Sequence, residues 1–196
     1  MNTIKAEKRS MDVKAKKLRR EGFVTGNVFG KEIKDSIPLK IEKTELARVL
    51  KTSGKGSQIM LEVEGQSMDV LIKEIAYNAL KKQIDEIDFQ ALVSGEKVHS
   101  VAEIVFVNQE KLQNGVLQEL LHEISYKALP SALVEKVQID VSELKVGESI
   151  KVKDLEIARD KDVHILTDLD AAVATVLRPN TAVASEDETE EAAEEK

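Results

Sequence analysis

The stretch QIMLEVEGQSMDVLIKEI, residues 58–75, indicates β structure, because apolar and polar residues tend to alternate along it. A period of two is typical of strands with one buried face. The alternation is interrupted at Glu64-Gly65-Gln66, and a glycine between two alternating runs favours a turn. The stretch therefore predicts two strands joined at residues 64–66.

Similar patterns lie on both sides of this stretch, and they predict a mainly β protein with short helices (α+β). Before it, we expect strands in TIKAEKR (3–9), GFVTGNVFGKE (22–32) and SIPLKIE (36–42). After it, we expect them in IDEIDFQALV (84–93), VHSVAEIVFV (98–107) and residues 136–155 with a turn at 145–147. DAAVATVLRP (170–179) would end the folded part of the chain. GKGSQI (54–59) lacks the third glycine of a dinucleotide fingerprint and is predicted to be a connecting turn.

Two short helices are expected near the start of the chain. Ser10 would cap the first helix, which carries Met11, Ala15 and Leu18 on one side, and Gly22 would end it. Thr44 would cap the second helix, over residues 44–51. VLQELLHEISYKAL (116–129) is ambiguous, because its leucines fit a helix while its neighbours favour strands.

The charge distribution divides the chain. Residues 1–90 hold 18 basic and 14 acidic residues, whereas the remainder holds 11 basic and 22 acidic residues. We predict an N-terminal domain over residues 1–93, a β-rich C-terminal domain over residues 94–179, and a disordered acidic tail over residues 180–196.

Several classes of function lack their sequence signals. The absence of cysteine excludes disulfides, Cys-ligated zinc and thiol catalysis. The three histidines are far apart, HEISY at residue 122 is not the HExxH zinc motif, and no GxSxG elbow occurs. We therefore expect neither catalysis nor a cofactor or metal. Without an apolar run of roughly 18 residues or a secretory signal, we also expect no membrane contact and a cytoplasmic location.

A basic cluster at residues 14–20, KAKKLRR, contains five cations in seven positions. On a helix these cations would form a patch away from the apolar side. A basic patch in an acidic protein is a pattern typical of polyanion binding, although a solvated helix face gives the same composition.

Two motifs resemble the bacterial 5S rRNA-binding large-subunit ribosomal protein 25 family, whose two-domain members are called general stress protein CTC. RREGFVTGNVFGK (19–31) is similar to that family's Arg–x–Gly–x–x–Pro–Gly–x–x–Tyr–Gly–Lys segment, and VLIKEIAYNALKKQIDEIDFQ (70–90) to its segment ending in His–x–Asp–Phe. Residues 128–155 and 163–179 resemble its added C-terminal domain.

The resemblance implies an N-terminal six-stranded β-barrel-like domain that binds 5S rRNA without catalysis in the large ribosomal subunit. The C-terminal domain would contact neighbouring ribosomal proteins. Family positions at or near RNA correspond to Arg9, Lys14, Arg19, Arg20, Lys73 and Asp88. The candidate RNA-binding set also includes Phe29, at the family's tyrosine, and Lys16 and Lys17 of the basic cluster.

The chain departs from the family motifs at five positions: Thr25, Phe29, Ala76, Ala79 and Glu86, where the family has proline, tyrosine, glutamine, proline and histidine. Three of these changes remove a hydrogen-bond donor. An alternative hypothesis is therefore a diverged paralogue that has lost selective 5S rRNA binding and acts as a stress-related protein-binding module.

Overall fold

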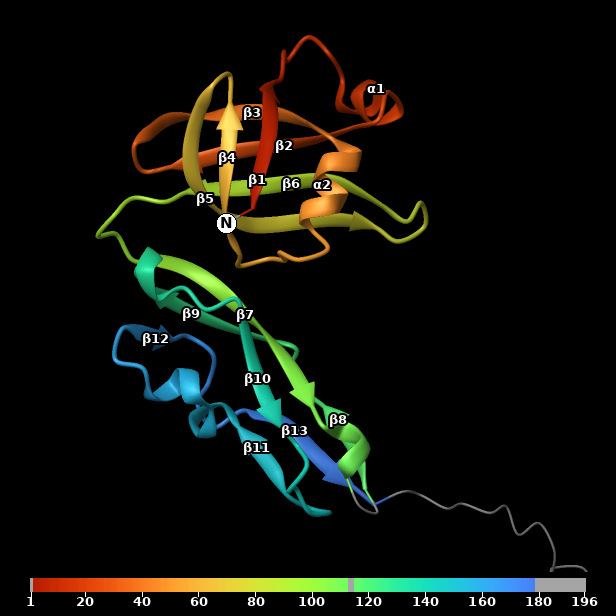
Figure 1. The fold of residues 1–196 in the computed structure, drawn as a ribbon, viewed down its shortest axis with the longest axis vertical. Helices are drawn as coiled ribbons and strands as arrows, with labels where there is room; N and C mark the ends of the chain where they lie inside the picture. The colour runs from red at the N-terminus through yellow and green to blue at the C-terminus, as the bar shows by residue number, and fades with distance from the viewer. Residues whose placement is uncertain (1, 113–114, 179–196) are drawn as a thin grey trace, which may run out of the picture.

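We describe residues 2–112 and 115–178 of a computed structural model. Figure 1 shows two parts. We call residues 2–93 the barrel, and residues 94–112 with 115–178 the C-terminal region. Strands dominate both parts, and the few helices are short, which confirms the predicted fold class. The predicted acidic tail lies outside the described residues.

Six strands close the barrel in the order β1-β3-β2-β6-β5-β4. Neighbouring strands are antiparallel except for the parallel pairs β1–β4 and β2–β6. The strands are β1 (Thr3–Lys8), β2 (Phe23–Gly30), β3 (Ile33–Glu42), β4 (Gln58–Val63), β5 (Gln66–Asn78) and β6 (Gln83–Ala91).

The stretch at residues 58–75 forms the β4–β5 hairpin, as predicted. Along β4 the alternate residues Ile59, Leu61 and Val63 are buried, which accounts for the period of two. The turn residues Glu64 and Gly65 have φ values of 50° and 83°. Two consecutive positive φ angles match the twist that a two-residue hairpin requires.

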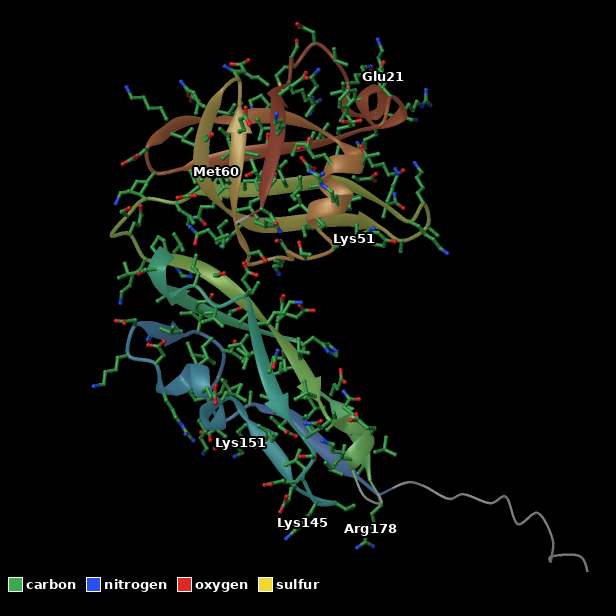
Figure 2. All side chains as sticks on the ribbon, viewed as in Figure 1. Glu21, Lys51, Met60, Lys145, Lys151 and Arg178 are labelled. Atoms are coloured by element: carbon green, nitrogen blue, oxygen red, sulfur yellow. The ribbon has the colours of Figure 1, made fainter. Side chains whose placement is uncertain are left out.

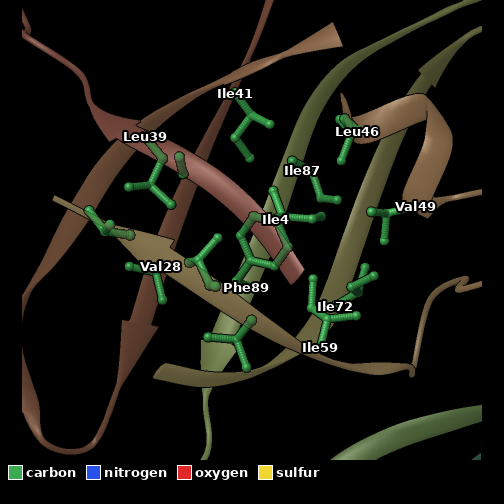
Figure 3. Packing of buried hydrophobic residues seen from close by; sticks show 14 of the residues in the cluster. Ile4, Val28, Leu39, Ile41, Leu46, Val49, Ile59, Ile72, Ile87 and Phe89 are labelled. Carbon is green, nitrogen blue, oxygen red and sulfur yellow. The ribbon is translucent and has the colours of Figure 1, made fainter. Parts of the chain in front are cut away.

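The barrel interior is apolar, and Phe89 of β6 is fully buried in it (Figure 3). Its neighbours in the core cluster include Ile4, Val28 and Ile72. Gly26 of β2 allows β2 to approach β6, because a Cβ atom there would lie 2.2 Å from the carbonyl oxygen of Ile87. The close parallel pairing of β2 with β6 therefore depends on this glycine.

Both predicted helices exist, but both predicted caps are wrong. Helix α1 spans Ala15–Arg20 with Lys14 at its N-cap, because Ser10 instead exchanges hydrogen bonds with Asp12 in the preceding turn. Helix α2 spans Lys43–Val49, so Thr44 lies inside it, and its N-cap Glu42 makes no side-chain capping bond.

The C-terminal region contains two small sheets. One has the order β10-β7-β9-β12, from β10 (Lys136–Asp140), β7 (Val98–Val107), β9 (Glu123–Ala128) and β12 (Val163–Ile165). The other has the order β11-β13-β8, from β11 (Ser149–Lys151), β13 (Ala172–Leu177) and β8 (Val116–Glu119). Short 3₁₀ helices lie at Gln109–Lys111 (η1), Pro130–Ala132 (η2), Val152–Asp154 (η3) and Glu156–Arg159 (η4).

Residues 116–129 form strands rather than a helix. Strand β8 pairs with β13 and β9 pairs with β7, so partners distant in sequence supply their backbone hydrogen bonds. A second hydrophobic core surrounds the fully buried Tyr126 of β9. The Tyr126 hydroxyl donates to the carbonyl oxygen of Val134 at 2.9 Å and accepts from its N–H at 2.8 Å.

The turn at residues 54–57, between α2 and β4, contacts the C-terminal region. Gly56 has a φ of +86°, and a Cβ atom there would lie 2.0 Å from the carbonyl oxygen of Val101 in β7. Beside it, Lys55 Nζ lies 3.1 Å from a carboxylate oxygen of Glu123. The predicted connecting turn is thus also the junction between the two parts of the molecule.

Candidate nucleic-acid interface

Helix α1 presents most of the basic cluster to solvent. It packs on β2 through the buried Leu18, the one buried residue of the helix. The helix ends where predicted, because Gly22 adopts a φ of +93°. The exposed cations on and beside this helix are Lys14, Lys16, Lys17 and Arg20 (Figure 2, where Glu21 marks the end of α1).

Arg19 differs from the exposed cations because it is half-buried and pairs with a carboxylate of another element, whereas Lys17 pairs only with Glu21 one turn away, at 3.9 Å. Its Nη1 lies 3.5 Å from Asp85 Oδ2. The same carboxylate accepts hydrogen bonds from Asn78 at 3.0 Å and from Gln83 at 2.9 Å. These two hydrogen bonds, followed by the charge of Arg19, hold the pKa of Asp85 below its usual value. Helix α1 is thereby linked to the hairpin between β5 and β6.

The outward side chains of β2, β6 and β5 form a face next to α1. The register places Thr25, Glu86 and Ala76 in one row across the three strands. Two residues further along β2, Asn27 lies in a row with Asp88 and Glu74. The face therefore carries three acids, in contrast to the cations of α1.

Hydrogen bonds fix two of these outward residues. Asn27 Nδ2 donates to Asp88 Oδ1 at 3.4 Å, so the predicted site residue Asp88 has a partner on the neighbouring strand. Thr25 is buried, and its hydroxyl donates to the carbonyl oxygen of Asp85 at 3.3 Å. Phe29 lies on the same side of β2, is 38% exposed, and pairs in register with Gln90.

Arg9 and Lys73 are not gathered with the exposed cations of α1. Arg9 Nη2 donates to the carbonyl oxygen of Val13 at 3.1 Å, and its Nε is buried without a hydrogen-bond partner among the described residues. Arg9 therefore braces the turn before α1. Lys73 Nζ donates to the carbonyl oxygen of His99 at 2.8 Å, which places Lys73 at the junction with the C-terminal region.

Lys73 lies in a groove of about 640 Å³ between the two parts, together with Lys55 and His99. Burial, and to a lesser extent the positive charge of Lys55, lower the pKa of Lys73. A partly desolvated lysine bonded to a backbone carbonyl is a structural contact. Its environment is thus unlike that of the α1 lysines.

Sequence reasoning missed Asn27 and Asp85. The outward alternation of Thr25, Asn27 and Phe29 along β2 contains the signal for Asn27. Nothing in the local pattern singles out Asp85, because its partners Asn78 and Arg19 come from two other elements. In the parts of the chain that the structure describes, no three acidic or histidine side chains gather as a metal site, and no helix is long and apolar enough to span a membrane.

Comparison with known proteins matches both parts of the molecule. The model of the Ribosomal L25p family matches residues 4–89, and that of the ribosomal protein TL5 C-terminal domain matches residues 97–180. A large ribosomal subunit protein bL25 of Bacillus velezensis is 31% identical over 160 residues, covering 79% of this chain and 78% of the relative. The chain belongs to the bL25 family.

Further bL25 relatives show the same extent of similarity. The protein of Burkholderia ambifaria is 34% identical over 153 residues, which cover 74% of each chain. That of Thermoanaerobacter sp. is 30% identical over 145 residues, which cover 73% of this chain and 72% of the relative. The predicted family is confirmed, and the alternative of a diverged stress-related module is not favoured.

Proposed function

We propose that this bL25 family member is a non-catalytic protein of the large ribosomal subunit that binds 5S rRNA through its barrel. The relatives are named for the large ribosomal subunit, which supports ribosome association and with it a cytoplasmic location. The observation that carries the RNA assignment is the set of exposed cations on α1 beside the outer face of β2, β6 and β5.

The two surfaces suit different parts of an RNA helix. Cations on phosphates release counterions and supply affinity without reading sequence. An A-form helix also offers a wide, shallow minor groove with 2′-hydroxyls, which a rigid strand face can contact. In our proposal Lys14, Lys16, Lys17 and Arg20 lie on phosphates, and Asn27 and Phe29 lie toward the groove. Arg19 joins the phosphate contacts while it remains fixed by Asp85.

The C-terminal region takes a different role in this proposal. Its acidic excess repels a polyanion, so its partners are neighbouring ribosomal proteins rather than RNA. The contacts at Gly56, Lys55 and Lys73 hold it against the barrel on elements other than α1.

A salt titration of RNA binding tests the proposal. The full chain is mixed with 5S rRNA, or with a control RNA of equal length, and the affinity is measured by gel shift. Four or five phosphate contacts at α1 alone should make log affinity fall against log salt with a slope of roughly −3 to −4.5. Phosphate contacts elsewhere should steepen it, and 5S rRNA should bind more tightly than the control. Equal affinity for both RNAs would contradict selective 5S rRNA binding.

A further inference from the structure

The tip of the β5–β6 hairpin carries exposed apolar side chains that the proposed interface does not use. Leu80 at the tip is 98% exposed, and Tyr77 near the end of β5 is 61% exposed. Together they line a shallow hollow of about 390 Å³. Single exposed apolar residues are ordinary, but an aromatic and an aliphatic side chain exposed together on one projecting hairpin indicate a binding surface.

The partner's chemistry follows from the charges beside these residues. Lys81 and Lys82 are exposed at the same tip, directly after Leu80. An aromatic ring next to cations is the combination that binds single-stranded nucleic acid, since the ring stacks on a base and the cations lie on phosphates. An apolar protein partner would leave both lysines unpaired. RNA therefore matches the hairpin tip better than a protein surface does.

The tip is continuous with α1 and is held in place before any ligand binds. Asn78 accepts a hydrogen bond from the Lys81 N–H at 3.2 Å, and its amide nitrogen donates to Asp85 at 3.0 Å. Asp85 in turn pairs with Arg19 of α1. Figure 1 shows the hairpin projecting from the side of the barrel where α1 lies. One RNA molecule can therefore contact both elements without the hairpin having to become ordered first.

We propose that the β5–β6 hairpin tip is a second RNA-contacting arm, in which Tyr77 stacks on an unpaired base and Lys81 and Lys82 lie on the adjoining phosphates. The proposal rests on the proposed function, because it extends the same RNA site. It adds a preference that the α1 cations cannot give: an RNA with an unpaired base beside its helix binds better than a continuous duplex.

Substitutions in the full chain test the role of the ring. Tyr77→Ala should weaken binding to 5S rRNA by about tenfold or more, which is the scale of one lost base–aromatic stack. Tyr77→Phe retains the ring and should change the affinity by less than about twofold. Neither substitution should alter the salt slope, whereas replacing Lys81 and Lys82 by Ala should reduce its magnitude by about 1.4 to 1.8.

A fluorescent variant reports stacking directly. The chain contains no tryptophan, so Tyr77→Trp introduces a single indole at the hairpin tip. Its emission should be quenched by 5S rRNA but far less by a fully paired duplex of equal length. Leu169→Trp, at a residue of the C-terminal region that is 49% exposed, is the matched control and should not respond.

The outcomes separate this inference from the proposed function. If the wild-type chain binds 5S rRNA selectively, but Tyr77→Ala binds equally well and the Tyr77→Trp emission is unchanged, the hairpin inference alone is wrong. If the wild-type chain shows no preference for 5S rRNA over control RNA, both proposals fail. If Tyr77→Ala binds naked 5S rRNA normally but no longer associates with purified large subunits, the tip contacts a protein and the inference is overturned.

Discussion

The cations of α1 and those at the junction between barrel and C-terminal region are the same kind of residue in opposite situations. Lys14 and Lys16 extend into solvent and Lys17 has only a 3.9 Å pair with the exposed Glu21, whereas Lys55 and Lys73 are engaged by Glu123 and by the carbonyl oxygen of His99. Exposed cations remain available for phosphates. The role of a lysine therefore depends on the surface on which the fold places it.

Removing the α1 cations should weaken RNA binding more than any other change. Replacing Lys14, Lys16, Lys17 and Arg20 by Ala should reduce the magnitude of the salt slope by about 3 to 3.6, and weaken RNA binding on the order of a thousandfold at about 0.1 M salt. Gel shifts at several salt concentrations measure both quantities.

A control with four charges removed from the C-terminal region isolates position from net charge. Lys111, Lys136, Lys145 and Lys161 are all exposed there, and replacing them by Ala makes the same change in formal charge. This control should keep its salt slope. If both variants lose affinity equally, net charge rather than α1 determines binding, and the comparison between the two groups of cations does not hold.

A smaller change, in RNA selectivity, is expected from substitutions on the outward face of β2, β6 and β5. Ala76 and Glu86 are partners in register on β5 and β6, so Ala76→Gln with Glu86→His places two donor side chains next to each other. Selectivity for 5S rRNA over control RNA should rise by about tenfold, since a good polar base contact in DNA is worth about 1–3 kcal/mol. Phe29→Tyr is a separate test, because Phe29 lies four residues along β2 from Thr25, the partner of Glu86 in register. Unchanged selectivity in the double variant would mean that these positions do not contact bases.

Replacing Lys73 at the junction should have almost no effect on RNA affinity and a modest effect on stability. We propose that the boundary between two domains lies at residues 93 and 94, and that Lys73 helps to hold them together. Lys73→Ala should change RNA affinity by less than about twofold. It should lower the free energy of unfolding by about 1 kcal/mol and speed proteolysis near residues 94–97, because a hydrogen bond across the junction is lost. A large loss of RNA affinity instead would place Lys73 in the RNA site.

The β fold could be predicted because its signal is local. Alternation along β4 and β6, and the glycines at residues 22 and 65, indicate strands and their ends without reference to distant residues. Residues 116–129 could not be assigned in the same way. Their leucines fit a helix, and only pairing with β13 and β7 selects the strand conformation.

The candidate site was predictable only in part. The grouping of cations near α1 could be predicted because they are adjacent in sequence. The environment of Lys73 could not, because its hydrogen-bond partner His99 is distant in sequence. The pairing of β5 with β6 shifts register between Ile72 and Glu74, so alternation breaks at Lys73. The predicted Ser10 cap was wrong for a different, local reason. The Ser10 hydroxyl forms hydrogen bonds with Asp12 in the preceding turn and does not cap the helix.

Replacing Asp85 should cause only a small, pH-dependent change in stability. The pKa of Asp85 is lower in the folded protein than in the unfolded chain, so its contribution to stability is present above its unfolded pKa and is lost as pH falls through its folded pKa. Asp85→Asn should be less stable than the wild type at neutral pH, and the difference should vanish at low pH. Urea unfolding at pH 7 and about pH 2 measures it. A difference that persists unchanged at low pH would mean that the carboxylate charge is not the cause.

Cosedimentation with large ribosomal subunits lacking their native copy of this protein tests whether the α1 cations hold the protein on RNA. At moderate salt, the wild-type chain and the variant lacking four lysines of the C-terminal region should sediment with the subunits. The variant lacking Lys14, Lys16, Lys17 and Arg20 should remain in the supernatant, because it has lost its phosphate contacts. If the α1 variant sediments as fully as the wild type, α1 does not provide the RNA contact and the proposed interface is wrong.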